Sequence, residues 1–576
     1  MSDSLWPSTG FGAMLALMSD LTGTYAHPPV LGVDWSEWTA LNASIGGQLR
    51  LSTPFELPCF ASFEGHALPP DSAACAAVQA NYTDAPFRVA QFGAAMNAQW
   101  ETCQSTGAKC LLDDANPSSP AAYQDQNCDI GNIAPLHIDV RAAEHVQAAY
   151  EFSSKHGVRL SVKNTGHDYA GRSSGHNTLG LWVSTLNKDL MAFSDAFVPE
   201  QCDGSHKAIT IGAGVKMEDM YAFADKHNVT AIGGYHRTVA TGYFLGGGHS
   251  VLSTVYGLGA DRVVQIKVVT PDGKYRTVNK CQDSDLFWAL RGGGGSAFGV
   301  VTELTVTVEP QLTIQAAVVA FPPSPSTLTA WYKLMADNAL EWSNAGWGIH
   351  LVPGSFVAVN PRLDNAAASK AMQGAVDLAN AQGGTAVVDE LPSFYEFFTK
   401  YVVATENPVG PEVLPSSRLL SNSLFATESG KASLLAAIAQ VPSALPIVIV
   451  ASNPNPALFA YEEGSTSFTP AWRDSAWHFL IGAGFAYNST LADRQQMYTL
   501  ASQLMQPFRE LTPGSGAYFN EADVYEPNHE QSFWGSNYAK LAEVKKKYDP
   551  NHIMDCWQCV GWKGASDPLF TCYVQV

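Results

Sequence analysis

Three glycine-rich segments between residues 163 and 300 place the tightest constraint on how this chain can fold. They span residues 163–175, 242–250 and 286–300. One such cluster is typical of a flexible turn, but three in one region indicate a ligand. Glycine lets backbone N–H groups approach a ligand and form an anion-binding nest, and the glycine triplet at 246–248 lets a flat ring lie against the main chain. We therefore expect a ligand that contacts the backbone here.

Hydrophobic periodicity around these segments predicts alternating strands and helices. Strands are expected at 136–140, 158–162, 179–183, 208–211 and 229–232, and helices at 142–156 and 217–226. Gly157 is a typical helix stop. Pro271-Asp-Gly273, between residues 262–269 and 275–278, predicts a hairpin. The pattern is that of an α+β domain.

The chain of 576 residues is too long for one hydrophobic core, so several domains are expected. They are a covering segment at 1–130, an α+β domain at 131–310, a second α+β domain at 311–510 and a compact aromatic segment at 511–576. Pro322, Pro323 and Pro325 indicate a linker. Strands are expected at 447–451 and 477–481 in the second domain.

The charge of the chain excludes some partners. Acidic side chains number 53 and basic ones 33, for a formal net charge of −20. Such a surface repels phosphate backbones and anionic lipids, so we expect neither nucleic acid nor a membrane as a partner. No apolar run approaches the roughly 20 residues that span a bilayer.

Ten cysteines and four Asn-x-Ser/Thr sequons favour a secreted, disulfide-bonded protein. The sequons, which are candidate glycosylation sites, begin at Asn42, Asn81, Asn228 and Asn488. The apolar run at 11–18 lacks the basic region of a signal peptide, since no Lys or Arg precedes Arg50, so either the true signal has been removed or the run is core. Spacing does not determine disulfide pairing, and Cys103–Cys110 and Cys202–Cys281 are guesses from position.

Other cofactor motifs are weak. Gly292, Gly294 and Ala297 match a dinucleotide-binding pattern, but they follow a helix-like stretch instead of a strand. No pair of histidines has the short spacing of a zinc site, so no metal is expected. Cys556-Trp-Gln-Cys559 could suggest metal or redox work, but a disulfide is the better interpretation.

The three loops, in this order, resemble the FAD-binding domain of the vanillyl-alcohol oxidase/p-cresol methylhydroxylase flavoproteins, and more closely the berberine-bridge-enzyme-like and fungal isoamyl-alcohol-oxidase-like proteins. Residues 518–523, 534–538 and 548–551, with Leu541 and Lys545, are similar to the terminal segment of those enzymes. The similarity covers about residues 103–310 and 511–562. It implies an α+β fold with a two-part FAD-binding domain and an α/β substrate domain, whose antiparallel sheet is covered by helices. We expect a monomer.

The resemblance also implies the cofactor contacts. In Gly166-His-Asp-Tyr169, His167 corresponds to the residue linked covalently to the flavin, although a lone loop histidine is usually just solvated. The diphosphate loop is expected to use Lys163, Asn164, Thr165, Gly166, Asp168, Tyr169, Gly171, Arg172 and Ser173. Other expected contacts are Thr238, Gly242, Gly246, Gly247, Gly248, His249, Phe298, Gly299, Val300, Val301 and Asn520.

Two departures from the family pattern affect the chemistry. Doubly linked members carry a cysteine where this chain has Tyr235 or His236, so we expect one histidyl linkage, with these two residues near the flavin edge. The position of the usual Tyr or His base is taken by Glu521. In a strand, Glu521 and Phe519 would share one face and Tyr518 the other. Partial burial would raise the pKa of Glu521 and suit it to accept a proton.

Each catalytic candidate also has a non-catalytic interpretation. Glu521 could be a salt-bridged or surface glutamate. His478, a weaker catalytic candidate than Glu521 or Tyr518, could be a core histidine. The function expected is an FAD-dependent oxidase that takes a hydride from an alcohol, carbohydrate or secondary metabolite and passes electrons to O2, forming H2O2. A dehydrogenase or oxidative cyclase, and a non-catalytic carbohydrate-binding flavoglycoprotein, are the alternatives.

Overall fold

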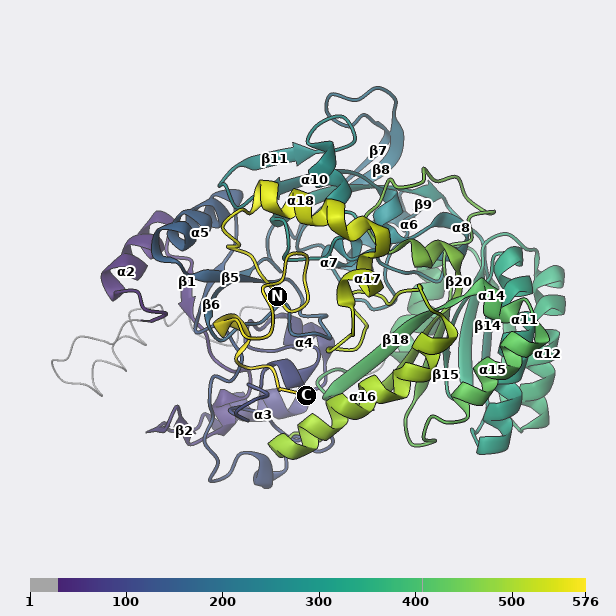
Figure 1. Cartoon of the computed structure of the whole chain (residues 1–576), viewed down its shortest axis with the longest axis horizontal. Helices are drawn as coiled ribbons and strands as arrows, with labels where there is room; N and C mark the ends of the chain where they lie inside the picture. The colour runs from purple at the N-terminus through teal and green to yellow at the C-terminus, as the bar shows by residue number, and fades with distance from the viewer. Residues whose placement is uncertain (1–29, 407) are drawn as a thin grey trace.

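The computed structural model describes residues 30–406 and 408–576. The apolar run at 11–18 lies outside the described residues. Figure 1 shows two parts: several small sheets lie on one side, and a large sheet backed by long helices lies on the other. The C-terminal segment crosses the first part. The α+β fold class is therefore confirmed.

The first sheet holds the first glycine-rich loop. Its order is β1 (Leu49–Leu51), β4 (Leu136–Asp139), β6 (Thr178–Trp182) and β5 (Arg159–Lys163), and β4, β6 and β5 are parallel. Residues 164–177 connect β5 to β6 as a loop without helix or strand. Helix α5 (Ala143–His156) buries Val146, Ala149 and Tyr150 at helical spacing and ends at Gly157, which has φ 71°.

The second sheet is antiparallel and follows in the chain. Its order is β11 (Tyr275–Val278), β10 (Val263–Val269), β12 (Val300–Thr307), β8 (His206–Gly212) and β7 (Met191–Phe197). The expected hairpin at Pro271 is confirmed as β10 and β11. The strand expected at 229–232 is shorter, because β9 (Val229–Thr230) pairs only with the two residues of β13 (Glu309–Pro310). The helices here are α6 (Met217–Lys226), α7 (Gly242–Leu245), α8 (Ser253–Tyr256), α9 (Gly259–Arg262) and α10 (Ser284–Ala289).

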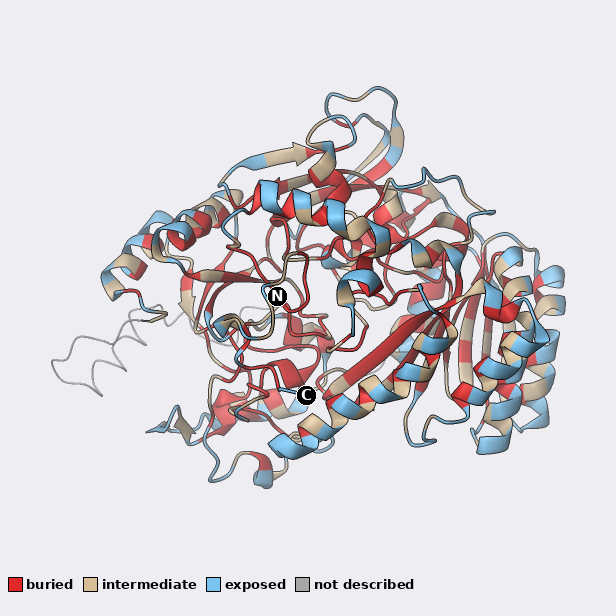
Figure 2. Ribbon diagram, in the orientation of Figure 1, coloured by how far each residue is buried: buried red, intermediate tan, exposed pale blue. Residues whose placement is uncertain are grey.

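The third sheet has seven antiparallel strands. Their order is β17 (Thr385–Leu391), β14 (Ile314–Ala320), β16 (Ser355–Asn360), β15 (Gly348–Val352), β19 (Ile447–Ala451), β20 (Ser475–Gly484) and β18 (Val413–Ser421). Helices α11 (Pro325–Ala345), α12 (Asn365–Ala381), α14 (Asn422–Phe425), α15 (Glu428–Ile438) and α16 (Leu491–Leu511) pack along one face (Figure 1). Figure 2 shows their buried sides toward the strands and their exposed sides outward. This is the expected antiparallel sheet covered by helices.

The proline-rich stretch at 322–325 does not separate two domains. It follows β14, which already belongs to the third sheet, and leads into α11. Ser324 caps that helix by accepting a hydrogen bond from the Thr327 N–H, and Pro325 occupies its first turn. The prolines therefore start a helix.

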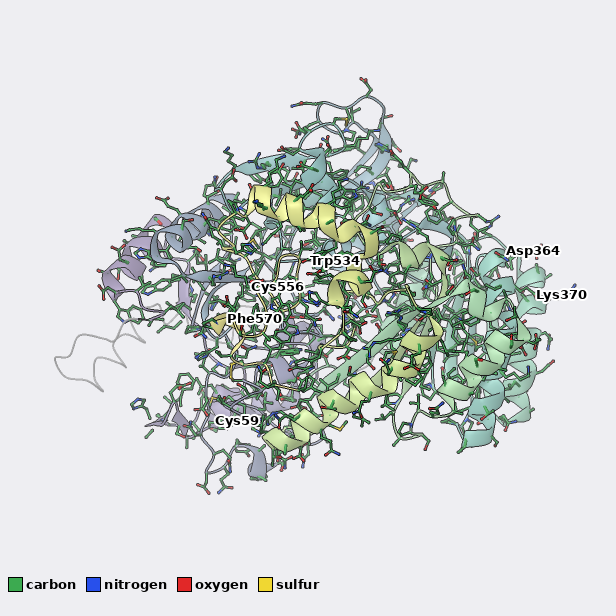
Figure 3. The ribbon with its side chains drawn as sticks, in the orientation of Figure 1. Cys59, Asp364, Lys370, Trp534, Cys556 and Phe570 are labelled. Atoms are coloured by element: carbon green, nitrogen blue, oxygen red, sulfur yellow. A yellow bond between two sulfur atoms is a disulfide. The ribbon has the colours of Figure 1, made fainter. Side chains whose placement is uncertain are left out.

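The covering segment and the C-terminal segment lie on the first part. The covering segment includes α2 (Trp35–Ser44), α3 (Ser72–Ala80), α4 (Ala85–Val89), β2 (Ser62–Phe63) and β3 (His66–Ala67). The C-terminal segment includes α17 (His529–Trp534) and α18 (Tyr538–Tyr548). The ammonium of Lys545 in α18 donates to the Ala297 carbonyl at 2.6 Å and to Asp549 at 2.7 Å. Figure 3 shows Trp534, Cys556 and Phe570 in this central region, and Lys370 of α12 with its N-cap Asp364 at the far edge of the molecule.

All ten cysteines form disulfides. The pairs are Cys59–Cys75, Cys103–Cys572, Cys110–Cys128, Cys202–Cys281 and Cys556–Cys559. Cys202–Cys281 and the Cys556–Cys559 bond are confirmed. The guess Cys103–Cys110 is wrong, because the end of the chain returns to place Cys572 beside Cys103, with Cα atoms 4.5 Å apart.

The four sequon asparagines differ in exposure. Asn228 and Asn488 are exposed, whereas Asn42 and Asn81 are half-buried, and the Asn81 amide donates to the Ala77 carbonyl. Within residues 30–406 and 408–576, none of the helices combines the length and apolar content needed to cross a bilayer.

Candidate active site

Three candidate residues from distant parts of the chain meet beside the glycine triplet. The Nε2 atom of His249 lies 3.1 Å from both carboxylate oxygens of Glu521. The Nε2 atom of His478 lies 2.8 Å from Glu521 Oε2. The side chains of His249 and Glu521 are 16% and 19% exposed, and that of His478 is fully buried. His478 therefore holds Glu521 from behind, while the other two keep an accessible edge.

Different elements supply the three side chains. His478 comes from the central part of β20 and is fixed by its strand neighbours. His249 follows the glycine triplet, in the turn between α7 and α8. Glu521 lies in a loop before α17. Since β20 belongs to the third sheet and the others to the first part, the cluster forms where the two parts meet.

The protonation of this cluster differs from the expectation. Burial by itself raises the pKa of Glu521, but the charges and hydrogen bonds of His249 and His478 outweigh it and hold this pKa well below its usual range. The expected raised pKa is therefore wrong. Burial lowers the pKa of His478, although Glu521 opposes the shift. Glu521 is thus a salt-bridged carboxylate, paired with both histidines.

Residues 518–521 form a turn instead of a strand. The Glu521 N–H donates to the Tyr518 carbonyl at 3.1 Å, which closes the turn. Tyr518 and Glu521 consequently both face His249, and the rings of Tyr518 and His249 meet edge to face at 5.4 Å. Phe519 points elsewhere. The alternation expected for a strand is therefore wrong, because the backbone folds back within four residues.

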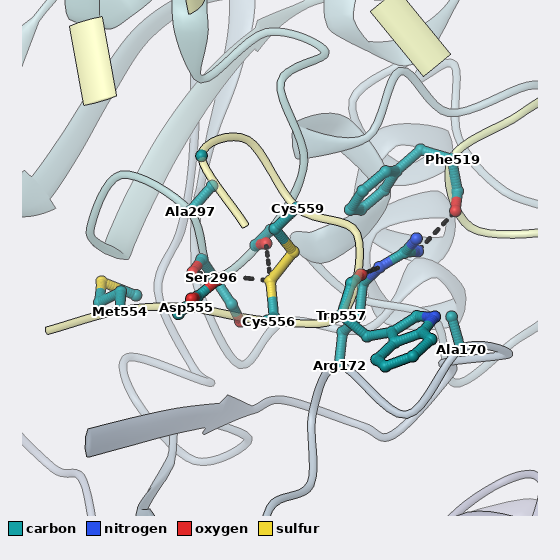
Figure 4. The surroundings of a disulfide bond; sticks show 12 residues. Ala170, Arg172, Ser296, Ala297, Phe519, Met554, Asp555, Cys556, Trp557 and Cys559 are labelled. Atoms are coloured by element: carbon teal, nitrogen blue, oxygen red, sulfur yellow. Dashed lines mark hydrogen bonds between the residues drawn. A yellow bond between two sulfur atoms is a disulfide. The ribbon is translucent and has the colours of Figure 1, made fainter. Parts of the chain in front are cut away.

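Phe519 is held by Arg172 of the first glycine-rich loop (Figure 4). The guanidinium of Arg172 lies 3.7 Å from the centre of the Phe519 ring and donates to the Phe519 carbonyl at 2.6 Å. It also donates to the Trp557 carbonyl at 2.8 Å, next to the Cys556–Cys559 disulfide. Arg172 thus attaches the C-terminal segment to the loop.

His167 lies in the same loop with one ring nitrogen engaged. Its Nε2 lies 2.7 Å from the Thr238 hydroxyl, and its ring meets that of His236 at 4.5 Å. Burial, followed by His236, holds the pKa of His167 well below its usual range, so the ring is neutral. Its Nδ1 has no hydrogen bond to any described residue.

The loop around His167 presents unpaired backbone donors. Asp168 fixes the loop by accepting from the N–H groups of Ala170 and Ser173 at 2.9 and 2.7 Å. The remaining donors have no acceptor in the described part of the chain; they are the N–H groups of Gly166, His167, Tyr169, Gly171 and Arg172. Such a row of donors is typical of an anion-binding loop.

Two polar residues at the start of the loop have different surroundings. The ammonium of Lys163 donates to the carbonyls of Gln91 and Phe92, at 3.2 and 2.6 Å, and to that of Ala94. Burial lowers its pKa to about 7. The amide of Asn164 donates to the Ala213 carbonyl, but its buried Oδ1 has no hydrogen-bond partner. Lys163 therefore holds the covering segment, and Asn164 has an acceptor left over.

The glycines of the other two loops allow close packing. A Cβ atom on Gly248 would lie 2.7 Å from the Tyr243 ring, and one on Gly294 would lie 2.7 Å from the Phe519 ring. Both glycines also have positive φ, 77° and 101°. The glycine triplet thus lies against aromatic side chains, among them Tyr518, whose hydroxyl is 3.8 Å from where a Gly246 Cβ would be.

The remaining candidates lie around these loops. The Tyr235 ring meets that of His350 edge to face at 4.7 Å. Phe298 and Val301 are buried in the hydrophobic core. At this turn, therefore, the backbone of Gly299 is what remains available to a ligand. Three more polar candidates, Thr165, Thr238 and Asn520, are buried or half-buried near the same loops.

Sequence reasoning missed the contact of His249 with Glu521 and the presence of His350. His249 and Glu521 are 272 positions apart, so no local pattern could pair them. Burial lowers the pKa of His350 to about 4; His249 and His478 add to this shift and Glu521 opposes it, so His350 lies beside the cluster.

These residues fit an FAD cofactor. The unpaired N–H groups of the His167 loop suit a diphosphate, and the leftover acceptor of Asn164 suits a hydrogen-bond donor on the ligand. The free nitrogen of His167 is available for a bond. Because all ten cysteines are in disulfides, no thiol remains for a second linkage.

Comparison with known proteins finds flavoprotein relatives. Residues 135–279 match the family described as FAD binding domain, and residues 517–556 match the one described as berberine and berberine like. The FAD-linked oxidoreductase ffsJ of Aspergillus flavipes is 39% identical over 568 residues, covering 92% of each chain. The VAO-type flavoprotein MtVAO615 of Myceliophthora thermophila C1 has a crystal structure with a TM-score of 0.78 and 27% identity, covering 94% of this chain and 96% of that one.

A further solved structure shares only the fold. Glucooligosaccharide oxidase of Acremonium strictum, described with a 6-S-cysteinyl, 8α-N1-histidyl FAD, has a TM-score of 0.61 and 20% identity, covering 74% of this chain and 92% of that one.

The chain belongs to the FAD-linked oxidoreductases of the vanillyl-alcohol oxidase and berberine-bridge-enzyme type, so the resemblance seen in the sequence is confirmed. It is an FAD-binding oxidoreductase, and the non-catalytic alternative is not favoured.

Proposed function

We propose that this protein is an FAD-dependent oxidase that removes a hydride from a carbon bearing a hydroxyl group and passes the electrons to O2, with H2O2 as the second product. The observation that carries the proposal is the Glu521 carboxylate between two histidines, beside the glycine triplet. Bound FAD supplies the hydride acceptor and the reaction with oxygen. The chain must supply an acceptor for the hydroxyl proton.

His249 with Glu521 is that acceptor. The carboxylate accepts from His249 Nε2, so a neutral His249 carries its lone pair on Nδ1. Nδ1 takes the hydroxyl proton, and the adjacent negative charge stabilises the imidazolium that forms, as in other carboxylate–histidine pairs. His478 holds Glu521 in position. The edge-on Tyr518 ring limits the orientation of His249.

We propose His167 as the single covalent attachment of FAD. Its neutral ring has a free nitrogen, and the position that carries cysteine in doubly linked relatives has Tyr235 and His236. The full pairing of the ten cysteines supports one linkage over two.

Secretion is part of the proposal. Five disulfides are typical of an oxidising compartment, and the exposed sequons at Asn228 and Asn488 are open to glycosylation.

The substrate and acceptor can be tested on the purified protein. A panel of primary alcohols, oligosaccharides and secondary alcohols is mixed anaerobically with it, and bleaching of the flavin band identifies a substrate. Rapid mixing of the reduced protein with O2 follows. Fast reoxidation with stoichiometric H2O2 is expected, and slow reoxidation would indicate the dehydrogenase or cyclase instead.

Glu521→Gln is expected to slow flavin reduction by about 10²-fold, because the neutral amide no longer stabilises the imidazolium of His249. Stopped-flow absorbance measures the rate, and FAD is expected to stay attached. Glu463→Gln, at an exposed carboxylate, is the matched control and should reduce normally. Normal reduction in Glu521→Gln would remove this residue from the mechanism.

A further inference from the structure

His249, His478 and Glu521 offer three ligand atoms that converge on one point. Two imidazole nitrogens and one carboxylate oxygen lie within 4.8 Å of one another. We propose that these residues bind one divalent transition-metal ion of the Zn²⁺ class, and that the bound ion blocks oxidation by occupying the proton-accepting pair. The inhibition rests on the proposed function; the binding does not.

The distances suit a small tetrahedral ion. Zinc bonds to nitrogen and oxygen of about 2.0–2.1 Å place neighbouring ligand atoms about 3.3 Å apart. The two histidine-to-carboxylate separations are 2.8 and 3.1 Å, so an ion enters with small outward shifts of the side chains. Two histidines and a glutamate form a known catalytic zinc set with a fourth position open. Here the accessible edges of His249 and Glu521 leave that position open.

The charges of the group also suit a cation. Metal ions require deprotonated ligands, and the group offers one carboxylate and two imidazoles. One carboxylate and two imidazoles around a divalent ion leave a net positive site. Protons compete for the imidazoles, so binding weakens in acid.

The surroundings also limit the affinity. A ligating histidine usually donates its other N–H to an acceptor, and losing that partner costs about 10–100-fold in affinity. His478 Nδ1 is buried and has no hydrogen-bond partner. Coordination through Nε2 would place its proton on this nitrogen. We therefore expect micromolar instead of nanomolar binding.

An ion at this position would stop the chemistry in a defined way. It would take His249 Nε2 and a Glu521 oxygen, which forces the remaining His249 proton onto Nδ1. Nδ1 could then no longer accept the hydroxyl proton of the substrate. Removal of the ion by a chelator restores the lone pair, so the inhibition is reversible.

The test uses the FAD-loaded full chain after dialysis against a chelator. Calorimetric titration with ZnCl₂ is expected to show one site at pH 7.5 and at least 10-fold weaker binding in His249→Asn and in His478→Asn. His66→Asn, at an exposed histidine on β3, is the matched control and should bind as the wild type. Flavin absorbance and the unfolding temperature show that each variant is folded.

Two further measurements locate the ion and its effect. Diffraction across the zinc edge of soaked crystals should place one anomalous peak between the three side chains, and zinc should slow anaerobic flavin reduction until chelator is added. Equal zinc uptake by both histidine variants, a peak elsewhere or undiminished reduction at saturating zinc would overturn the proposal. Failure of the oxidase proposal appears separately, as normal flavin reduction in Glu521→Gln without zinc.

Discussion

Glu521 and Glu412 are both largely buried carboxyl groups, but their pKa values are shifted in opposite directions. Glu521 is paired with two histidines, which lower its pKa despite its burial. Glu412 is buried near the acidic Asp114 and Glu101, with Lys109 as a counteracting cation, and burial followed by Asp114 raises its pKa to about 8. At the residue scale, the partner that a buried carboxyl meets decides whether it holds charge.

Glu412 makes stability fall as the pH rises. Its pKa is about 8 in the folded chain and 4.5 ordinarily, so between these values the folded state binds the proton and the unfolded state does not. Glu412→Gln removes this difference. We expect the variant to be more stable than the wild type at pH 8, with a smaller gap at pH 5. Urea unfolding at both values measures it, and an equal gap at the two pH values would contradict the assignment.

His167→Ala is expected to release the flavin on denaturation. The wild type should keep its yellow colour in the acid-precipitated protein, because the bond to the imidazole survives unfolding. Absorbance of the supernatant after precipitation measures the release. His176→Ala, at a histidine in the same β5–β6 connection, is the control and should retain the colour.

At the scale of elements, local pattern predicted strands and helices well. The bounds expected for α6, β11 and β19 agree with the structure, because their apolar spacing is set within a few residues. The strand pattern considered for residues 518–521 is wrong because Arg172, 347 positions away from Phe519, donates to the Phe519 carbonyl, and this segment pairs with no neighbouring strand. Hydrophobic periodicity carries no information about contacts between residues so far apart in the sequence.

The same limit applies to the site. The glycine loops and the His167 motif could be predicted from sequence, since both depend on residue types in short runs. The meeting of His249, His478 and Glu521 could not, because the three come from separate elements and only the folded chain brings them together. The predicted Cys103–Cys110 bond is wrong for the same reason, because the true partner, Cys572, is 469 residues away in the sequence.

Gly294→Ala should disrupt the third glycine-rich loop. Its Cβ would lie 2.7 Å from the Phe519 ring, and its φ of 101° is strained for alanine. We expect a loss of about 1–3 kcal/mol of unfolding free energy and weaker retention of flavin. Gly295→Ala is a matched control next in sequence, because a Cβ there meets nothing within 4 Å. Equal stability of the two variants would contradict this packing.

At the scale of the whole molecule, covalent bonds and charged pairs join parts that are far apart in sequence. Cys103–Cys572 joins the covering segment to the C-terminal segment. Arg509 of α16 donates to Glu526 at 2.6 Å and to Asp523 at 3.0 Å, which attaches the third sheet's helix layer to the C-terminal segment. The C-terminal segment therefore contacts every other part.

The double variant Cys103→Ser/Cys572→Ser should lose more stability than Cys556→Ser/Cys559→Ser. The loop-entropy relation assigns about 6 kcal/mol to the long ring and about 2 kcal/mol to the short one, because a long ring restricts the unfolded chain more. The two bonds span 469 and 3 residues. Thermal unfolding of both variants measures the difference. The opposite order would mean that the contacts around Cys556 in the folded state matter more than the unfolded ensemble.

The Cys103–Cys572 bond also sets an order of events during biosynthesis. Cys572 follows Cys103 by 469 residues, so the thiol of Cys103 must wait until this whole stretch has been translated before it can meet its partner. Once the bond has formed, residues 103–572 are a covalent circle. A protease that cuts this circle once releases no separate fragment, and the two pieces come apart only after reduction.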